Sequence, residues 1–381
     1  MERQGIRQEI DEIDEKLVGL FKRRMELSLS MADWKRESGQ PIFDQGRERE
    51  VINRVSELAG EELAGYARVW HGGLLDVSRS IQNQALSAED RPIAREVRLA
   101  REGTPRLFPE SATVACQGVE GAYSQEAAVK LFQNPKILYV ESFDGVFRSV
   151  ESGLCRYGVL PIENSSAGSV TTVYDLLKSK GFYVVRSTAL HIRHALLCKA
   201  ALPPEKIRKI YSHEQALRQC ARYLGSLSGV QVLECANTAV AAKMAAEAEA
   251  GEGVAAISSP ACAALYNLKT LDLSIQDESN NHTRFICISK KLEIYPGANK
   301  VSLMMALPHR AGTLYRALAR IAALNLNLTK IESRVIPGSD FEFMFYFDIG
   351  ASIEDERVIR LLAEFERDYE ELNFIGAYSE A

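Results

Sequence analysis

The chain lacks the features that mark secreted, membrane-spanning and zinc-binding proteins. Its seven cysteines are scattered, and no two of them form a Cys-x-x-Cys pair, which fits neither a disulfide framework nor a zinc site. No apolar run is long enough to span a membrane, and Glu2, Arg3 and Glu9 stand where a signal peptide would have its apolar segment. We therefore expect buried free thiols and a cytoplasmic location.

The chain also lacks an excess of positive charge. The net charge is -5, with 46 Lys and Arg against 51 Asp and Glu, so no broad basic face for nucleic acid or for a membrane surface is expected. A length of 381 residues, of which 46% are apolar, is enough for two or three domains with cores of their own. The composition indicates a soluble multidomain enzyme or regulator.

Residues 1–86 predict one long helix with an apolar seam, followed by two shorter helices. In the long helix, two lines of apolar residues repeat every seven positions. One line holds Ile6, Ile13, Leu20, Leu27 and Trp34, and the other holds Ile10, Leu17 and Met31. Arg24 occupies a position of the second line, where a cation is costly unless an anion meets it.

Arg7 and Lys35 lie on a neighbouring line of this helix, 28 residues apart, which corresponds to about 42 Å. They cannot contact one small ligand within the same chain. If two such helices pack antiparallel, Arg7 of one chain approaches Lys35 of the other, so the spacing predicts a dimer with two cationic pockets. The alternative is that these cations are solvated, or extend along the apolar surface toward water.

Two shorter helices are expected next. Asp44 is a suitable N-cap for the first of them. The second is expected over about 62–86, with Ser78 and Gln82 one turn apart. Gly72-Gly73 lies inside this last helix and disfavours it, so we expect either a kink or close packing there.

The three helices resemble the all-helical chorismate mutase domain, which forms an intertwined dimer. In that family arginines, one of them from the partner chain, hold the carboxylates of chorismate, and a Lys and a Gln or Glu hydrogen-bond the ether oxygen that breaks. The resemblance implies the site residues Arg7, Arg24, Lys35, Asp44, Arg47, Glu48, Ser78 and Gln82, with Lys35 and Gln82 catalytic. A pericyclic rearrangement needs no metal or cofactor, because orientation and charge stabilisation suffice.

Residues 87–111 are charged, aperiodic and rich in proline, and we interpret them as a linker with one short helix over 93–101. Strands and helices alternate after the linker, which predicts an α/β domain with a largely parallel sheet. The order of the segments divides this domain into two lobes, 112–190 with 270–290 and 191–269. Ligands tend to bind in the cleft between such lobes.

Polar residues follow a short apolar run, 159–162, in this domain. Glu163, Asn164 and Ser165 lie at the end of the expected strand and before a helix-like run that begins at residue 170. Polar groups at the carboxyl end of a strand, facing a helix N-terminus, form a ligand site in α/β sheets. An ordinary loop that caps the helix would explain the same pattern. Ser124 is likewise expected to cap a helix over 125–132.

Four sequence motifs, in the same order, resemble prephenate dehydratase across 112–290. They are Gly118-x-x-Gly121-x-Tyr123-Ser124, Pro161-Ile162-Glu163-Asn164-Ser165, Tyr211-Ser212-His213-x-Gln215 and Thr283-Arg284-Phe285. In that family the Thr of Thr-Arg-Phe is catalytic. The resemblance implies a cleft lined by Ser124, Glu163, Asn164, Ser165, Ser212, Gln215 and Arg284 around Thr283.

The chemistry of that family requires a donor at a departing hydroxyl. Prephenate loses hydroxide and carbon dioxide, and a Thr hydroxyl is too weak an acid to be the proton source at neutral pH. We therefore interpret Thr283 as a hydrogen-bond donor to the leaving oxygen and Glu163 as a candidate proton source. A metal is disfavoured, because His191 and His194 cannot share one side of a strand; His282 stays a candidate site residue.

The segment 298–379 shows the order βαββαβ, which predicts a ferredoxin-like unit. His309 to Leu314 and Ile331 to Arg334 resemble the two ligand motifs of an ACT regulatory domain, which binds phenylalanine between paired domains. The resemblance implies the effector residues Gly312, Thr313, Leu314, Glu332, Ser333 and Arg334. A module that only dimerises is the alternative.

The domain order resembles the family of bifunctional chorismate mutase/prephenate dehydratases of phenylalanine biosynthesis. The resemblance implies chorismate and prephenate as substrates, L-phenylalanine as effector, no cofactor, and a homodimer or a dimer of dimers. Two other interpretations remain open. One is a dehydratase whose helical domain only dimerises, and the other is a non-catalytic small-molecule sensor.

Overall fold

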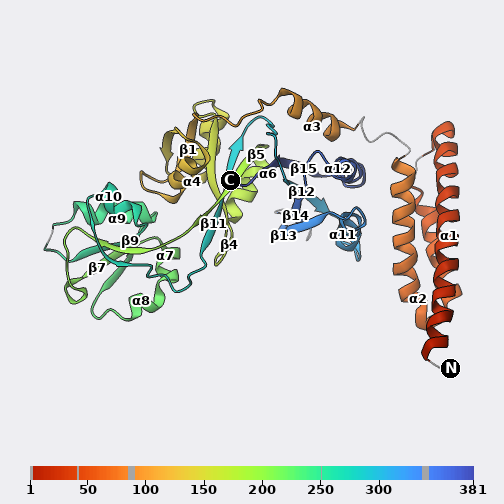
Figure 1. Cartoon of the computed structure of the whole chain (residues 1–381), viewed down its shortest axis with the longest axis horizontal. Helices are drawn as coiled ribbons and strands as arrows, with labels where there is room; N and C mark the ends of the chain where they lie inside the picture. The colour runs from red at the N-terminus through yellow and green to blue at the C-terminus, as the bar shows by residue number, and fades with distance from the viewer. Residues whose placement is uncertain (1–2, 41–42, 85–90, 250, 337–342) are drawn as a thin grey trace. The chain divides into compact units, whose positions relative to one another are not determined.

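The computed structural model describes residues 3–40, 43–84, 91–249, 251–336 and 343–381 (Figure 1). These residues form two compact units, 1–98 with 305–372 and 99–304 with 373–381. Among the described helices, none combines the length and the apolar character that a membrane span requires. All seven cysteines are free and six are buried, which confirms the expected free thiols; burial raises the pKa of Cys116 and of Cys220 to about 12.

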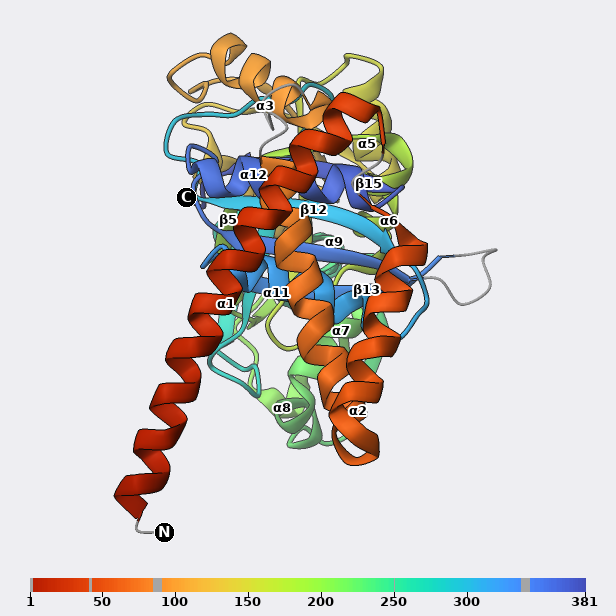
Figure 2. The ribbon, with the colours of Figure 1, turned by 90° about the vertical axis from the view of Figure 1, so that its right-hand side faces the viewer.

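The N-terminal region consists of α1 (Arg3–Ser38) and α2 (Gln45–Gln84), and α2 is broken at Gly60. Gly60 has φ 73°, and the chain turns back there, so that Arg68 Nε donates to Ser56 Oγ at 3.0 Å (Figure 2). Asp44 caps the start of α2 as expected, because its Oδ1 accepts from the backbone N–H of Arg47 at 3.0 Å. The three expected helices are therefore confirmed as far as residue 84; the expected end at residue 86 lies outside the described residues.

The glycine pair of α2 does not kink the helix. Gly60 is the one residue within α2 with non-helical backbone angles, so the kink expected at Gly72-Gly73 is wrong. The positions that a Cβ would take at Gly72 and Gly73 have no neighbouring atom within 4 Å among the described residues. Close packing inside the chain does not explain the pair either, and the space beside it is open.

The apolar lines of α1 are uncovered in the single chain. All residues from 3 to 23 are exposed, and Leu20 is 69% exposed (Figure 2). The buried residues of α1 lie in its second half, at Met25, Ser28 and Ala32. The first half of α1 therefore carries apolar residues that no other described residue of the chain covers.

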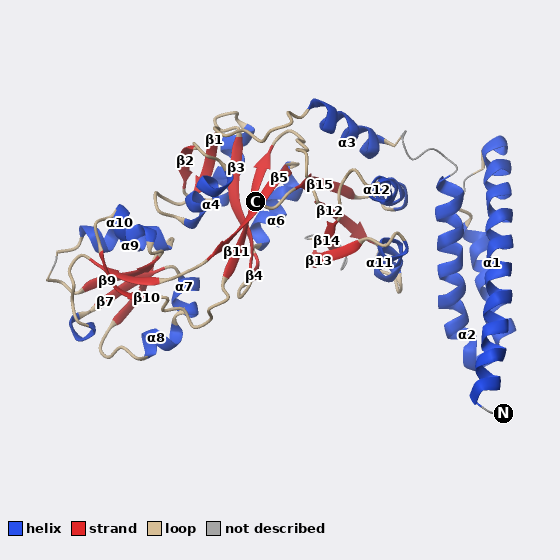
Figure 3. Cartoon of the chain, viewed as in Figure 1, coloured by secondary structure: helices blue, strands red, loops and turns tan. Residues whose placement is uncertain are grey.

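Lobe 1 of the α/β region is a mixed sheet with the order β2-β1-β3-β11-β5 (Figure 3). Its strands are β1 (Thr113–Gln117), β2 (Lys136–Val140), β3 (Tyr157–Asn164), β5 (Tyr183–His191) and β11 (His282–Ser289), and β4 (Gly168–Ser169) pairs with β3. β1 is parallel to β2 and β3, whereas β11 is antiparallel to β3 and β5. The expected largely parallel sheet is therefore wrong for half of this lobe.

Three helices pack on this sheet, and their starts correct two expectations. They are α4 (Tyr123–Leu131), α5 (Phe143–Glu151) and α6 (Thr171–Lys180). α4 begins at Tyr123 with Ala122 as its N-cap, so Ser124 is not the expected cap. β3 continues through Glu163 and Asn164, and a hairpin to β4 precedes α6; these two residues therefore belong to a strand and not to a loop.

Lobe 2 is a second mixed sheet with the order β10-β6-β9-β7-β8. Its strands are β6 (Ala195–Cys198), β7 (Lys209–Ser212), β8 (Gln231–Glu234), β9 (Val254–Ser258) and β10 (Lys269–Leu273). Its helices are α7 (Glu214–Gln219), α8 (Ala221–Gly225), α9 (Thr238–Glu247) and α10 (Ala261–Leu265), with a short 3-10 turn, Pro204–Lys206. The segment 214–225 forms two helices, α7 and α8, which meet at Cys220.

Two neighbouring segments connect the lobes. β5 ends at His191, which pairs with His282 at the start of β11, and their rings stack with centroids 4.7 Å apart. One residue further on, the N–H of Ile192 donates to the carbonyl of Asn281 at 2.7 Å. The strand that leaves lobe 1 and the strand that returns to it therefore lie side by side and antiparallel, which brings 189–192 next to 281–284.

The C-terminal segment has the expected element order βαββαβ. Its elements are β12 (Lys300–Leu307), α11 (Thr313–Ala323), β13 (Asn327–Val335), β14 (Phe343–Gly350), α12 (Glu356–Asp368) and β15 (Leu372–Tyr378). The strand order in its sheet is β13-β14-β12-β15. The sequence Pro337-Gly338-Ser339-Asp340 is typical of a turn, and it lies outside the described residues. The linker contains α3 (Pro92–Gly103), which confirms the short helix expected there.

The end of the chain pairs with β5 of lobe 1. The N–H of Ser187 donates to the carbonyl of Ser379 at 3.0 Å, and the N–H of Ala381 donates to the carbonyl of Ser187 at 2.8 Å. This approach is close at Gly376, where a Cβ would overlap the carbonyl oxygen of Val184. Glycine at this position is required by the contact between two backbones.

Replacing Gly376 by alanine should destabilise the protein. The added methyl group meets backbone that cannot rotate away, so we expect a loss of about 2–3 kcal/mol in the free energy of unfolding. Gly153→Ala is the matched control, because Gly153 has φ 77° but open space around its Cβ position. Thermal unfolding of both variants tests the contact, and equal losses in the two would assign the effect to backbone conformation alone.

Candidate functional site

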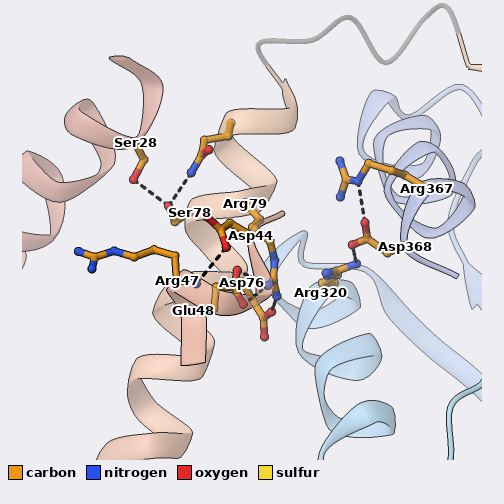
Figure 4. A network of polar contacts seen from close by, with 11 residues as sticks. Ser28, Asp44, Arg47, Glu48, Asp76, Ser78, Arg79, Arg320, Arg367 and Asp368 are labelled. Carbon is orange, nitrogen blue, oxygen red and sulfur yellow. Dashed lines mark hydrogen bonds and ion pairs between the residues drawn. The ribbon is translucent and has the colours of Figure 1, made fainter. Parts of the chain in front are cut away.

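The first candidate site lies between α1 and α2. Ser78 Oγ donates to Ser28 Oγ at 2.7 Å, and Gln82 Nε2 donates to Ser78 Oγ at 3.1 Å (Figure 4). Ser28 in turn donates to the carbonyl of Arg24 at 2.9 Å. The predicted residues Arg24, Ser78 and Gln82 are therefore brought together, although more than fifty positions separate Arg24 from Ser78 in sequence.

Three polar atoms in this group are buried without a hydrogen-bond partner among the described residues. They are Arg24 Nη1, Gln82 Oε1 and His71 Nδ1. Burial lowers the pKa of Arg24. It also lowers the pKa of His71, and the positive charges of Arg24 and Arg54 add to that effect. Buried polar atoms are normally paired, so this cluster has the donors and acceptors of a site for a polar, anionic molecule.

A second polar cluster lies beside the first. Arg79 Nη1 donates to both carboxylate oxygens of Glu48 at 2.5 Å, and Arg79 also pairs with Asp76 (Figure 4). Glu48 was predicted as a site residue, whereas Arg79 and Asp76 were not. The ion pairs with Arg79 fix the Glu48 carboxylate.

The other predicted residues of this region lie on α1, on α2 or just before α2. Arg47 is exposed and pairs with Glu50 at 3.0 Å, and Asp44 accepts the cap hydrogen bond. Lys35 is half-buried near the end of α1. Arg7 is exposed on the uncovered first half of that helix. One chain alone does not bring Arg7 to Arg24.

The second candidate site is centred on the ends of β3 and β11. The register places Thr283 opposite Asn164 and Arg284 opposite Glu163. Since successive residues of a strand point to opposite faces, the first pair lies on one face and the second on the other. Thr283 is 9% exposed and Asn164 is 6% exposed. The fold therefore forms two pairs from residues that the sequence placed in two separate motifs.

Asn164 is the centre of a hydrogen-bond network. Its Oδ1 accepts from the N–H groups of Ser166 and Ala167 at 3.1 and 2.9 Å, which anchors the side chain to the β3–β4 turn. Its Nδ2 donates to Thr283 Oγ1 and to Asn281 Oδ1, both at 2.8 Å. The side chain of Asn164 therefore joins the turn, the returning strand and the catalytic candidate Thr283.

Glu163 is engaged by Arg284. Arg284 Nη2 lies 3.3 Å from Glu163 Oε2, and the Arg284 side chain is 12% exposed. This pair holds the Arg284 guanidinium near the ends of β3 and β11, on the face of the sheet opposite Thr283. The geometry therefore favours Glu163 as the residue that orients Arg284 over its expected use as a proton source for the oxygen that Thr283 would contact.

The remaining predicted residues of this domain have structural contacts of their own. Ser212 is fully buried, and its hydroxyl donates to the carbonyl of Ile257 at 2.7 Å. Ser165 ties the β3–β4 turn to the strand that returns from lobe 2, because its Oγ accepts from the N–H of His282 at 2.9 Å. Ser124 is buried in α4, and Gln215 is half-buried at the start of α7. None of these four is recorded in a hydrogen bond to Asn164 or Thr283 among the described residues.

Three residues that the sequence reasoning did not select complete the network. Gln219 Nε2 donates to Ser166 Oγ at 2.8 Å, Asn281 Nδ2 donates to Gln219 Oε1 at 3.0 Å, and His194 Nε2 lies 3.0 Å from the same Gln219 oxygen. Gln219 lies four residues after the selected Gln215 on the same helix, so helical spacing offered a signal for it. His194 and Asn281 join the network through the crossing of the two connecting segments, which has no sequence signal.

The predicted effector residues lie at the start of α11 and on β13. Gly312 has φ 81° and precedes the helix, and Thr313 is 4% exposed with its hydroxyl donating to the carbonyl of Arg310 at 3.0 Å. Leu314 is half-buried. Along β13, exposure alternates, so that Ser333 is more exposed than its neighbours Glu332 and Arg334. Arg320 of α11 and Asp368 of α12 form an ion pair at 2.5 Å, which joins these two helices (Figure 4).

Comparisons with known proteins match the segments of the chain that carry the two candidate sites. Residues 6–83 match the family model of chorismate mutase type II, and residues 114–293 match that of prephenate dehydratase. The chain is 31% identical to the bifunctional chorismate mutase/prephenate dehydratase of Escherichia coli K12, over 98% of this chain and 95% of that protein. The corresponding protein of Aquifex aeolicus is 30% identical, over 99% of this chain and 97% of that protein.

A solved structure supports the fold of the larger part of the chain. The crystal structure of prephenate dehydratase from Arthrobacter aurescens in complex with L-Phe has a TM-score of 0.64 and 27% identity, and the match covers 70% of this chain and 89% of that one. The fold and the two sites define a multidomain enzyme with a helical site and a two-lobed α/β site. The chain belongs to the family of bifunctional chorismate mutase/prephenate dehydratases.

Proposed function

We propose that the chain converts chorismate to prephenate at the site of α1 and α2, and prephenate to phenylpyruvate at the site of β3 and β11. The division that we propose is a mutase domain over 1–86, a dehydratase domain over 112–290 and a regulatory domain over 298–379. The observation that carries the second activity is the Thr283–Asn164 pair at the end of two neighbouring strands. Neither reaction requires a cofactor.

The direction of one hydrogen bond supports the role of Thr283. Because Asn164 Nδ2 can only donate, Thr283 Oγ1 accepts from it, and the hydroxyl proton of Thr283 is left for another acceptor. In prephenate the ring C–carboxylate bond breaks, its electron pair enters the ring, and hydroxide leaves from the opposite carbon. Thr283 would stabilise the charge that develops on that oxygen, while a proton from solvent completes the water. Arg284 pairs with Glu163 on the face opposite Thr283, so this geometry does not support its expected contact with a substrate carboxylate.

The mutase site would be completed by a second copy of the chain. Arg24 supplies one cation, and its Nη1 is buried without a hydrogen-bond partner among the described residues. Arg7 lies on the uncovered part of α1, where the exposed apolar lines offer a contact surface for an antiparallel partner helix. In such a homodimer, Arg7 of the partner subunit would bring the second cation to Arg24. Lys35 and Gln82 would then hydrogen-bond the ether oxygen that breaks.

The C-terminal domain would be an ACT domain that regulates the dehydratase. Its support is the βαββαβ order, with the strand order of a ferredoxin-like unit, together with the effector motifs at 309–314 and 331–334. A structure that matches this chain, that of the Arthrobacter aurescens prephenate dehydratase, is a complex with L-Phe. We propose that L-phenylalanine binds this domain between paired copies and inhibits the enzyme.

An assay of the purified protein without added cofactors tests the proposal. Loss of chorismate and gain of phenylpyruvate are followed separately, with and without phenylalanine. Chorismate that persists while added prephenate is consumed would show that the helical domain only dimerises. If neither compound reacts, the protein is a sensor and not an enzyme.

Replacing Gly312 by alanine should weaken regulation by phenylalanine. Gly312 has φ 81°, a left-handed conformation that alanine adopts only with strain, so the substitution favours a different backbone conformation at the start of α11. We expect the phenylalanine concentration for half-maximal inhibition to rise by about 5- to 50-fold, which corresponds to a coupling change of about 1–2 kcal/mol. Titration of dehydratase activity with phenylalanine checks this; an unchanged midpoint would place the effector elsewhere.

A further inference from the structure

The hydrogen bonds around Asn164 have a fixed direction. A backbone N–H only donates, so the two that reach Asn164 Oδ1, from Ser166 and Ala167, identify that atom as the oxygen. The other amide atom, Nδ2, is therefore the donor, and Asn281 Oδ1 at 2.8 Å is an acceptor. The orientation of the Asn281 amide follows from that of Asn164.

The same reasoning extends from Asn281 to lobe 2. Because Asn281 Oδ1 accepts, its Nδ2 donates to Gln219 Oε1 at 3.0 Å, which fixes the Gln219 amide as well. Gln219 Nε2 then donates to Ser166 Oγ at 2.8 Å, in agreement with that orientation. Gln219 Oε1 is thus an acceptor, and the second group that contacts it, His194 Nε2 at 3.0 Å, must carry a hydrogen. Two backbone amides therefore determine which nitrogen of His194 is protonated.

The surroundings of His194 agree with a neutral ring that acts as a donor. The residue is 2% exposed, and burial lowers its pKa, although the hydrogen bond to Gln219 opposes that shift. Its Nδ1 is buried and has no hydrogen-bond partner among the described residues. The backbone N–H of His194 donates to Gln276 Oε1 at 3.0 Å, and the ring packs edge-on against Tyr123 with centroids 6.3 Å apart. The ring itself therefore packs against Tyr123, and Gln219 is its one polar contact among the described residues.

We propose that His194 is a positioning residue of the dehydratase reaction, whose Nε2–H holds the Gln219 amide and, through Asn281 and Asn164, keeps the hydroxyl proton of Thr283 directed to substrate. The inference rests on the proposed role of Thr283. His194 does not contact the reacting atoms itself. It stands at the far end of a chain of four hydrogen bonds whose other end is Thr283.

The chain of contacts explains why a donor is needed at this position. If the His194 donor were lost, Gln219 Oε1 would keep one hydrogen bond of two, and its amide could turn over. A reversed Gln219 would present N–H to Asn281 Nδ2, and two donors would then face each other. Asn164 itself cannot turn over, because the N–H groups of Ser166 and Ala167 hold its Oδ1. Asn281 would have to shift instead, and the hydrogen bond from Asn164 Nδ2 to Thr283 Oγ1 would lose its fixed geometry.

The experiment compares two replacements of His194. Phe keeps the ring and its contact with Tyr123 but removes the donor, whereas Gln places an amide N–H near the position of Nε2. We expect His194→Phe to lower dehydratase kcat by about 10- to 100-fold with KM changed by less than about threefold. His194→Gln should restore most of kcat. Mutase activity, measured on the same preparation, reports whether the chain is folded.

Equal losses in the two variants, or a rise in KM with kcat unchanged, would reduce His194 to a packing residue and overturn the proposal. A second test places His194→Phe in a Gln219→Ala background, where it should have little further effect, because His194 acts through Gln219. Independent, additive losses would also overturn it.

A spectroscopic measurement tests the tautomer in the unsubstituted protein. In the unsubstituted protein labelled with ¹⁵N-histidine, His194 should show a protonated Nε2 and a bare Nδ1, assigned by comparison with His194→Gln. A protonated Nδ1 in the neutral ring would contradict the inference. If Thr283→Ala leaves dehydratase activity intact, the proposed site fails as a whole. If Thr283→Ala lowers this activity but the His194 variants do not, only the inference about His194 fails.

Discussion

Replacing Thr283 by alanine should lower dehydratase kcat by about 100- to 1,000-fold, with a much smaller change in KM. The hydroxyl is expected to act on an oxygen whose negative charge develops as the bond breaks, so its contribution belongs to the transition state more than to the bound substrate. Steady-state kinetics with prephenate, following phenylpyruvate, measures both constants. An equal loss in kcat and in affinity would show that Thr283 only binds substrate.

Thr283→Ser is the matched control for this prediction. Serine keeps the hydroxyl and the acceptor for Asn164 Nδ2, which lies 2.8 Å from Thr283 Oγ1, and removes one methyl group. We expect it to keep activity within about tenfold of the unsubstituted enzyme. The mutase activity of the same chain should be unaffected in both variants, because residues 6–83 match a separate family model. A serine variant as inactive as the alanine variant would assign the effect to packing.

The fold could be predicted from sequence where local patterns decide it. The three N-terminal helices follow from apolar periodicity and from the cap at Asp44, and the C-terminal order βαββαβ follows from alternating strand and helix patterns. The direction of β11 could not be predicted in this way. Whether a strand runs parallel or antiparallel depends on where the chain re-enters the sheet, and β11 arrives from lobe 2 at the end where β3 finishes.

In the candidate site, too, some features could be predicted from the sequence and others could not. Thr283, Asn164, Glu163 and Arg284 could be selected from their motifs, but the register that pairs Thr283 with Asn164 is a tertiary property. Gln215 was selected where the structure places Gln219 in the network, because a motif defined at the start of a helix does not say which of two turns faces the site. The assumption that Glu163 supplies a proton also failed to anticipate its contact with Arg284.

The proposed mutase site can be tested with dimers whose two subunits carry different substitutions. Arg24→Ala and Arg7→Ala should each lower mutase kcat/KM by about 1,000-fold, because each removes a cation that a substrate carboxylate would otherwise meet in a buried site. The two residues lie 17 positions apart on one helix, about 25 Å, so one small ligand cannot contact both in the same chain. Under the proposed pairing, each site would take Arg24 from one subunit and Arg7 from the other.

A mixed dimer with one defect on each subunit should recover mutase activity. One of its two sites combines both substitutions, but the other combines an intact Arg24 with an intact Arg7, so we expect about half of the unsubstituted activity per dimer. The mixed dimers are isolated by co-expressing the two variants with different affinity tags. Dimers that carry Arg24→Ala on both subunits, with the same two tags, are the control and should stay inactive.

Recovery in the mixed dimer would establish the antiparallel pairing that the exposed first half of α1 indicates. Its apolar lines, with Leu20 at 69% exposure, would then be the dimer interface, and Arg7 would belong to the site of the other subunit. If the mixed dimer shows only the residual activities of the two parents, the site lies within one chain and the pairing is wrong. In that case the unpartnered Nη1 of Arg24 would need an anion that one subunit binds alone.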